Sequence, residues 1–453
     1  MPTLVLENFN VVCTILGGFI TVFGLVSVPL KERFYLSEAC KTCCPIWHVG
    51  WLTDLAVISL LAGIVLSPLA ANFIKPLDYA NDSSHNIDTI TLHFSRLVLG
   101  IQLVIAGIQL PSRYLRTEWR SLSILLGLGM PAMWLCGSLL VWAMVPHITF
   151  LHALAVGACI TPTDPVLSNS IVKGQFADRH IPKPLQRIII AESGANDGLG
   201  YPFLFIALYL IKYNGHEGFA GPGHAFGLWF GESWLYTIAL SIIYGALIGW
   251  LAQKLLHLAE DRNFVDRESF LVFAITIGLF VVGTGGLLGT DDILACFVAG
   301  NAFTWDDWFR KETEDDSLQP TIDMLLNITV FMWFGAIAPW SDFRVNDIIA
   351  LWRLVVLGIL VLLFRRIPFI LAVHKGISEI EHWRQALFTG FFGPIGVSAV
   401  FYLYVAVGYL DTIRLGGEVR SDAAHLQRVI RLVVWFLTIT SVVVHGQSRY
   451  KSL

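Results

Sequence analysis

Residues 148–171 read ITFLHALAVGACITPTDPVLSNSI, an apolar run that two prolines and an aspartate interrupt in its second half. A bilayer core requires about 20 apolar residues per helix, so this stretch is long enough to cross one. Pro162 and Pro165 each remove a backbone donor and clash with the preceding turn, which breaks a helix. Broken backbone at this depth is tolerated only where it is buried in protein or lines a cavity. The stretch therefore predicts a membrane helix that is broken inside a larger helical bundle.

The composition of the whole chain agrees with a membrane protein. Of its 453 residues, 55% are hydrophobic and only 14% are charged, and the mean hydropathy is +0.66. Soluble domains carry about 25% charged residues, so two or three soluble domains are excluded. The apolar residues come in runs of about 20 rather than in alternation, which disfavours a transmembrane β-barrel. The net charge of -4 excludes a strongly basic nucleic-acid binder, and we expect no nucleic-acid partner.

We predict a single all-α polytopic domain over residues 1–453 with about thirteen membrane helices. The predicted spans are 9–30, 52–74, 89–110, 121–145, 148–171, 186–211, 233–257, 269–288, 291–304, 321–340, 350–373, 385–409 and 425–446. With the N-terminus outside, most of the 30 lysine and arginine residues fall in inner loops, as the positive-inside rule requires. This orientation places the C-terminus in the cytosol.

The break in the fifth span carries hard oxygen ligands. Free backbone carbonyls, the hydroxyls of Thr161 and Thr163, and the carboxylate of Asp164 suit a small cation. Ionisable groups inside membrane spans are costly, about 2.5–3.5 kcal/mol each on insertion scales, and they mark function by default. The alternative is a structural proline kink in which Asp164 caps the second half-helix.

The sixth span carries a second polar cluster, AESGANDG at 191–198. On a helix, Ser193 and Asp197 are four residues apart and share a face, and Glu192 and Asn196 share a neighbouring face. Burial of a carboxyl group without a cationic partner favours its protonated form. Asp197 with Ser193 therefore suits a site that binds either a proton or a cation, whereas Glu192 needs a permanent partner. The alternative is that both pairs are structural hydrogen bonds.

The tandem Arg365-Arg366 in the eleventh span supplies such a partner. Arginine does not lose its charge in proteins, so at least one of the two requires a carboxylate. We expect Arg366 to pair with Glu192 and Arg365 to extend its side chain toward the cytoplasmic face.

Two further features lie in the ninth and twelfth spans. Asp291 and Asp292 open the ninth span, where an N-cap and a role in the ion path are both open interpretations. GPIGVSA at 393–399 interrupts the twelfth span at Pro394 and Gly396. Glycine and proline breaks at corresponding places in two halves of a chain are typical of inverted-repeat transporters.

Together these residues resemble the fungal plasma-membrane Na+/H+ antiporters of the cation–proton antiporter superfamily. The resemblance covers nearly the whole chain and is carried by Thr-Asp-Pro at 163–165, Glu-Ser-x-x-Asn-Asp at 192–197, Gly-x-Asp-Asp at 289–292 and Gly-Pro-Ile-Gly-Val at 393–397. It implies two inverted repeats, a dimerisation bundle and a mobile six-helix core. It also implies crossed, partly unwound helices at spans five and twelve.

The resemblance implies one central carboxylate, Asp197, which binds the ion and exchanges the proton. Thr163 and Ser193 would contribute oxygens, and Asp164 would hold Asn196. The remaining implied roles are a structural ion pair and two acidic residues on which transport depends. These residues are Glu192 with Arg366, and Asp291 with Asp292.

The implied function is secondary active export of Na+ and Li+, with K+ as a further candidate, in exchange for external H+ by alternating access. The resemblance implies a homodimer in the lipid of the plasma membrane, with no cofactor and no enzymatic activity. A cation channel and a membrane-embedded protease with Asp164 and Asp197 as a dyad are the alternatives. An organic-solute transporter would call for aromatic or arginine groups around the broken helices.

The chain departs from the family pattern in three places. Phe391-Phe392 stands where some members carry a histidine before the Gly-Pro-Ile-Gly-Val motif. The segment from Cys40 to Asp54 resembles an insertion, and we interpret its cysteine cluster as a loop rather than a zinc site. The sequence stops at Leu453, without the long hydrophilic tail of many members.

Overall fold

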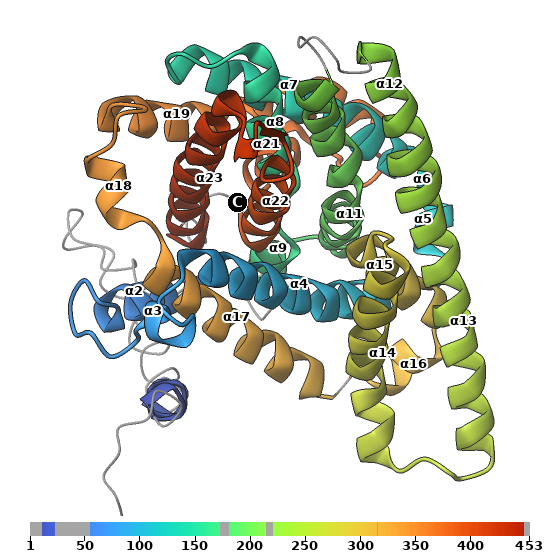
Figure 1. The fold of residues 1–453 in the computed structure, drawn as a ribbon. Helices are drawn as coiled ribbons and strands as arrows, with labels where there is room; N and C mark the ends of the chain where they lie inside the picture. Colours follow the sequence, from blue (N-terminus) through green and yellow to red (C-terminus); the bar gives the residue numbers. More distant parts are fainter. Residues whose placement is uncertain (1–10, 23–54, 173–180, 214–220, 315, 448–453) are drawn as a thin grey trace, which may run out of the picture.

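The computed structural model describes residues 11–22, 55–172, 181–213, 221–314 and 316–447 (Figure 1). Of the predicted first span, the structure describes the helix Val11–Val22. The segment from Cys40 to Asp54, with its cysteine cluster, lies outside the described residues. The further elements, in chain order, are α2 (Leu55–Leu66), α3 (Pro76–Tyr79), α4 (Ser84–Gln109), α5 (Tyr114–Thr117), α6 (Trp119–Leu122), η2 (Ser123–Gly129), α7 (Met130–Met144), α8 (Phe150–Cys159), α9 (Pro165–Val172), α11 (Lys183–Tyr213), α12 (Gly221–Leu228), η3 (Trp229–Ala239), α13 (Leu240–Asp261), α14 (Arg267–Leu288), α15 (Asp292–Phe303), α16 (Trp308–Glu312), α17 (Leu318–Ile337), α18 (Trp340–Arg344), α19 (Leu351–Phe364), α20 (Ile367–Val373), η4 (His374–Gly376), α21 (Trp383–Phe391), α22 (Val397–Leu410), β1 (Arg414–Leu415), β2 (Glu418–Val419) and α23 (Ser421–Gln447).

Several neighbouring elements form one continuous helix. α6, η2 and α7 run together over Trp119–Met144, and α12, η3 and α13 run together over Gly221–Asp261. The stretches η2 and η3 have wider, π-helical turns. Within the described ranges, seven helices are long and apolar enough to cross a membrane. Shorter apolar helices arise where a span is broken, as in the fifth span at α8 and α9 and in the twelfth at α21 and α22.

One small β-hairpin interrupts the helical pattern, which the all-α prediction did not include. Its two strands pair antiparallel, with Arg414 opposite Val419 and Leu415 opposite Glu418. Gly416 and Gly417 connect the strands with φ of +64° and +94°. A two-residue turn with positive φ at both positions favours glycine, which explains a hairpin in this polar loop.

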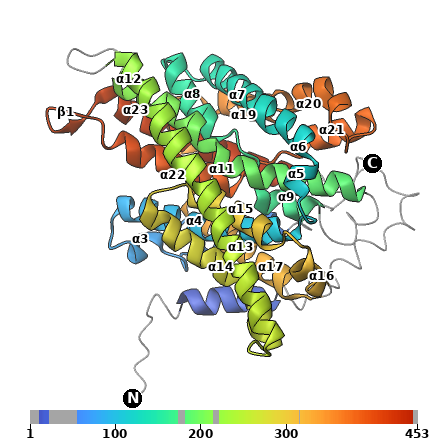
Figure 2. The same ribbon diagram turned by 90° about the vertical axis from the view of Figure 1, so that its right-hand side faces the viewer.

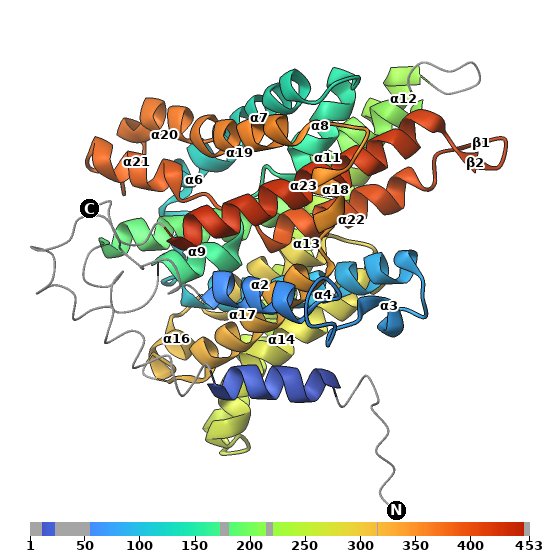
Figure 3. The same cartoon turned by 90° about the vertical axis from the view of Figure 1, so that its left-hand side faces the viewer.

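The helices pack as two groups. The core group contains α6–α9, α11 and α19–α23, and the scaffold group contains α2, α4, α12–α15 and α17. Figure 3 shows α7, α8 and α19 on one side of α22 and α23, and α2, α4 and α17 on the other. Figure 2 shows the long helix of α12, η3 and α13 running past α11 and α15, both of which it contacts. The broken helices α9 and α22 therefore face α4 of the scaffold group, and the neighbouring α11 faces α15.

Small residues allow helices of the scaffold group to touch through their backbones. A Cβ atom at Gly63 of α2 would lie 2.1 Å from the carbonyl oxygen of Met332 on α17. A Cβ atom at Gly335 of α17 would lie 2.1 Å from the carbonyl oxygen of Leu60. Close packing of this kind, rather than hydrophobic burial, holds helices together in lipid.

Candidate functional site

The breaks of the fifth and twelfth spans contact each other at the centre of the core group. Residues 160–164 separate α8 from α9, and residues 392–396 separate α21 from α22. The backbone amide of Asp164 donates to the carbonyl of Pro394 at 3.0 Å. The twelfth-span break thus supplies an acceptor for a backbone donor of the fifth-span break, where no intrahelical partner is present.

Asp164 caps both half-helices that begin after the breaks. Its Oδ2 accepts from the amide of Leu167 at 2.9 Å, in the first turn of α9. Its Oδ1 accepts from the amide of Ser398 at 3.2 Å, in the first turn of α22. Gly396 permits this approach, because a Cβ atom there would lie 2.5 Å from Oδ2. The contacts of Asp164 are therefore those of a helix cap, and both of its carboxylate oxygens accept hydrogen bonds from backbone amides.

Arg365 binds the opposite ends of the breaks, where α8 and α21 end. Its guanidinium donates to the carbonyls of Ile160, Thr161 and Gly393, and the residue is 3% exposed. The expectation that Arg365 extends toward the cytoplasmic face is wrong, because the carbonyls freed by the breaks need donors at this depth. A cation at two helix C-termini also interacts favourably with the negative ends of both helix dipoles. The Thr161 hydroxyl donates within α8, to the carbonyl of Gly157 at 2.7 Å.

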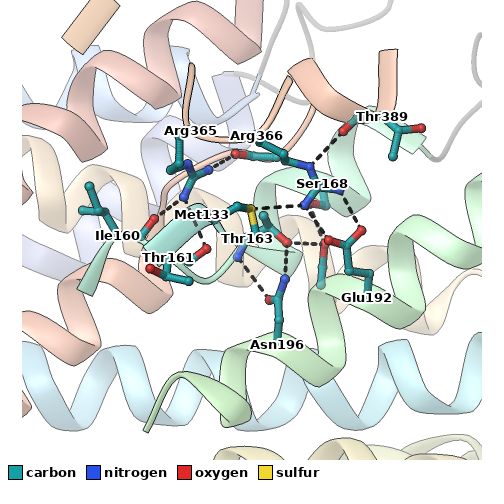
Figure 4. A network of polar contacts seen from close by, with 12 residues as sticks. Met133, Ile160, Thr161, Thr163, Ser168, Glu192, Asn196, Arg365, Arg366 and Thr389 are labelled. Carbon is teal, nitrogen blue, oxygen red and sulfur yellow. Dashed lines mark hydrogen bonds and ion pairs between the residues drawn. The ribbon is translucent and has the colours of Figure 1, made fainter. Parts of the chain in front are cut away.

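Glu192 and Arg366 form a bidentate ion pair in the interior (Figure 4). Nη1 of Arg366 lies 2.5 Å from Oε1 of Glu192, and Nη2 lies 2.7 Å from Oε2. Nε of Arg366 donates to the carbonyl of Thr389 at 3.0 Å. The side chains are 2% and 3% exposed, so α11 is held to the α19–α20 junction and to α21 by a desolvated pair.

Asn196 binds the broken fifth segment through Thr163. Its Oδ1 accepts from the amide of Thr163 at 3.1 Å, and its Nδ2 donates to Thr163 Oγ1 at 2.7 Å (Figure 4). Thr163 Oγ1 lies 3.2 Å from Ser193 Oγ, which donates to Ser168 Oγ at 3.1 Å. The expected contact between Asp164 and Asn196 is wrong, because the oxygens of Asp164 are occupied as caps. Ser168, which the sequence did not single out, belongs to this network.

Asp197 differs from its neighbours because its carboxylate has no hydrogen-bond partner. The residue is fully buried, and neither Oδ1 nor Oδ2 is paired with any described residue. Asp164 and Asp291 are close enough to repel its charge, and the hydroxyl of Ser398 lies within interaction range. The Ser398 oxygen also has no hydrogen-bond partner. Unpartnered oxygens from α11 and α22 therefore face each other beside the crossed breaks.

Tyr402 holds the backbone of the turn that carries Asp197. Its hydroxyl donates to the carbonyl of Asp197 and, at 3.3 Å, approaches that of Gly198. Pro202 lies four residues after Gly198 and removes the amide that would bond this carbonyl. Neither Ser398 nor Tyr402 was predicted. Their spacing of four residues, directly after the break in the twelfth span, is the signal that places both on one helix face.

The two aspartates of the ninth span have different surroundings. Oδ1 of Asp291 caps α15 by accepting from the amide of Leu294 at 3.0 Å, and its Oδ2 has no partner. Oδ2 of Asp292 instead accepts from Nε of Arg96 on α4 at 2.7 Å. Gly286 leaves room for this arginine, since a Cβ atom there would lie 2.0 Å from its Nη2. The N-cap interpretation thus accounts for one oxygen of Asp291, and Arg96 was missed as the partner of Asp292.

A family model described as "sodium/hydrogen exchanger, transmembrane" matches residues 44–448. The chain belongs to the sodium/hydrogen exchanger family. The family consists of transporters, so the membrane-embedded protease alternative is wrong. The resemblance inferred from the motifs of spans five, six, nine and twelve is confirmed.

Curated relatives from fungi match almost the whole of this exchanger chain. A probable Na+/H+ antiporter of Schizosaccharomyces pombe is 38% identical over 446 residues, which are 96% of this chain and 54% of that protein. A Na+/H+ antiporter of Saccharomyces cerevisiae is 35% identical, covering 95% of this chain and 42% of that protein. A further Na+/H+ antiporter of S. pombe is 30% identical, covering 98% and 90%. The chain thus spans about half the length of the first two relatives.

The fold is shared with a solved archaeal structure. The sodium proton antiporter MjNhaP1 from Methanocaldococcus jannaschii superimposes with a TM-score of 0.61 at 18% identity, covering 94% of this exchanger and 98% of that chain. The prediction of an all-helical membrane protein with several spans and an antiporter fold is confirmed.

Proposed function

We propose that this exchanger moves Na+ and Li+, with K+ as a further candidate, out of the cytosol in exchange for external H+. The observation that carries the proposal is the Asp197 carboxylate, which is fully buried and has no hydrogen-bond or ion-pair partner among the described residues. Burial without a cationic partner makes a bare carboxylate costly, so such a group binds either a proton or a metal ion. Competition between the two at one group couples the two fluxes.

In this structure the residues next to Asp197 hold the site in position through bonds to one another. Asn196 and Ser193 support Thr163, whose position fixes the break in the fifth span. Asp164 caps both half-helices, and its charge disfavours a second bare carboxylate at Asp197. We assign the cargo to Asp197, with Thr163 and Ser193 contributing oxygens when the network rearranges around a cation.

Asp291 and Asp292 form the proposed ion path between the site and one membrane face. Asp291 acts on Asp197 electrostatically and keeps one oxygen free, whereas Asp292 is paired with Arg96. With the N-terminus outside, α15 begins in the outer half of the membrane, so these residues lie outward of Asp197. They would attract a cation released from the core group and a proton that enters from outside.

Polar contacts that join the two groups of helices support alternating access. Arg431 of α23 binds Asp88 of α4, with Nη1 2.8 Å from Oδ1 and Nη2 2.5 Å from Oδ2. Tyr209 of α11 donates to Glu232 at 2.7 Å, and Trp229 donates to the carbonyl of Pro202 at 2.8 Å. These contacts lie near the end where α23 begins and α11 ends, which the predicted orientation places outside. Closure on this side fits a state that admits ions from the cytosol.

The gradient sets the limit of such exchange. One pH unit across the membrane is worth about 1.4 kcal/mol per proton, so an acid-outside gradient of one unit supports about tenfold Na+ extrusion at one-for-one stoichiometry. An uncompensated charge would add about 2.3 kcal/mol at 100 mV. We place this activity in a homodimer in the plasma membrane, with the N-terminus outside and the C-terminus in the cytosol.

Proteoliposomes with an imposed pH gradient test the proposal. Wild-type protein should dissipate the gradient on addition of Na+ or Li+, and Asp197→Asn should abolish this response while retaining its expression and melting temperature. Asp197→Glu should shift the pH profile, because it keeps the acid but moves it. Asp347→Asn is the matched control, since Asp347 is 73% exposed and should leave exchange unchanged. Gradient dissipation by Asp197→Asn at the wild-type rate would contradict the assignment.

The cation-channel alternative gives a different electrical result. A channel requires a continuous polar path or filter, whereas this site has unpartnered oxygens next to crossed, capped half-helices. Single-channel currents from reconstituted protein would favour the channel. Cation-dependent proton flux without such currents supports exchange.

A further inference from the structure

Ser398 occupies a position between the two central carboxylates. It lies in the first turn of α22, directly after the break in the twelfth span, and is fully buried. Its backbone amide donates to Oδ1 of Asp164 at 3.2 Å. Its side-chain hydroxyl lies within interaction range of the carboxylate of Asp197. The backbone of Ser398 thus serves a structural cap, and its side chain faces the transport carboxylate.

The hydroxyl of Ser398 is not satisfied by the protein. It has no hydrogen-bond partner among the residues that the structure describes, although buried hydroxyls in native proteins are usually paired. The other hydroxyls of the site are paired with one another, as Thr163 with Ser193 and Ser193 with Ser168. Both carboxylate oxygens of Asp197 likewise make no hydrogen bond of standard geometry with the described residues. The hydroxyl of Ser398 and the carboxylate of Asp197 are therefore neighbouring oxygens that no other described residue engages.

The orientation of Ser398 is fixed by the helix that carries it. Tyr402 lies four residues later, on the same face of α22, and its hydroxyl donates to the carbonyl of Asp197. A Cβ atom at Gly200 would lie 2.9 Å from ring carbons of Tyr402, so the two helices touch at this level. This face of α22 is therefore held against the turn of α11 that contains Asp197.

We propose that Ser398 is a ligand of the transported cation, together with Asp197. This inference rests on the function proposed above, because it assigns a further residue to the same site. A hydroxyl oxygen beside a carboxylate is a ligand that alkali cations accept as hard ions. When Asp197 is protonated, the same oxygen accepts a hydrogen bond from the carboxyl group. Ser398 therefore serves both occupied states of the site without moving away from it.

Transport kinetics of Ser398→Ala in proteoliposomes test the assignment. Deletion of one neutral ligand should raise the apparent KM for Na+ and for Li+ about fivefold to tenfold. The kcat should stay within about twofold, because the capping amide of Ser398 and the helix break remain. A residue with only a structural role would instead lower kcat or the yield of folded protein and leave KM unchanged.

Ser59→Ala is the matched control. Ser59 is also a fully buried serine whose hydroxyl has no partner in the described part of the chain, but it lies on α2 of the scaffold group. Its KM should equal that of the wild type. A KM for Ser398→Ala within twofold of the wild type and of Ser59→Ala overturns the ligand assignment. If the wild type itself shows no cation-dependent proton flux, the proposed antiport fails instead, so the two failures are distinguishable.

A binding measurement decides the question if Ser398→Ala does not yield folded protein. Ser398→Cys keeps nearly the same shape but offers sulfur, a poor ligand for a hard cation. Na+ should raise the melting temperature of the wild-type protein, and this rise should be reduced or absent in Ser398→Cys. A wild-type rise in Ser398→Cys would overturn the assignment without reference to transport.

Discussion

Removal of either partner of the Glu192–Arg366 pair should destabilise the protein strongly. Both side chains are almost fully buried and joined by two hydrogen bonds of 2.5 and 2.7 Å. Breaking a buried pair leaves one uncompensated charge and costs about 3–5 kcal/mol. Arg366→Met should cost about 1 kcal/mol more than Glu192→Gln, since it also loses the bond to the carbonyl of Thr389.

The double variant isolates the interaction energy between Glu192 and Arg366 from the contacts that each residue makes with other groups. With both charges removed, no bare ion remains, so Glu192→Gln with Arg366→Met should cost less than the sum of the single variants by about 3 kcal/mol. Unfolding in mixed detergent micelles, followed by tryptophan fluorescence, measures all three variants. Arg428→Gln is the control, because its pair with Asp347 is exposed and contributes little. Costs that add up, with coupling below about 1 kcal/mol, would refute the reasoning.

Two further variants test the capped breaks and the inner surface. Gly396→Ala should lower stability by about 1–3 kcal/mol and slow exchange, because the added Cβ atom would lie 2.5 Å from Oδ2 of Asp164. An unchanged melting temperature and exchange rate would contradict this close approach. Burial and the neighbouring carboxyl group of Glu379 raise the pKa of Glu118, which lies between α5 and α6. The stabilising contribution of Glu118 is therefore lost as the pH rises from the ordinary glutamate range through the raised value. Glu118→Gln should reduce the fall in melting temperature over this pH range. An unchanged dependence of melting temperature on pH would exclude this interaction between Glu118 and Glu379.

The broken helices could be predicted from the sequence because the effect of proline is local. Pro162 and Pro165 remove backbone donors wherever they stand in a helix, and the same reasoning applies to Pro394. The small hairpin after α22 was not predicted, although the pair Gly416-Gly417 is a local signal for a two-residue turn. Features that depend only on neighbouring residues, such as a helix break at a proline, could therefore be predicted from the sequence.

Partners that are distant in the chain were predicted less well. The contact between Arg366 and Glu192 follows from charge balance, since a buried arginine needs a carboxylate. Arg365 was misplaced because its acceptors are backbone carbonyls, which every residue carries and no sequence pattern marks. The contact between Asn196 and Asp164 was implied by the family resemblance alone, whereas the geometry of the break presents Thr163 to Asn196.

Residues whose polar atoms are hydrogen-bonded within the protein build the site, whereas residues whose polar atoms lack such bonds are the ones we expect to bind cargo. Glu192, Asp164 and Asp292 each accept a hydrogen bond from the protein itself, from arginine side chains or from backbone amides. The carboxylate of Asp197 and the hydroxyl of Ser398 lack hydrogen-bond partners among the described residues. Burial makes an unpaired polar group unfavourable. Such atoms persist in a native fold where a ligand compensates them. Variants of the first kind should therefore lose stability together with transport, and variants of the second kind should lose transport or cation affinity while their stability in the absence of cation is retained.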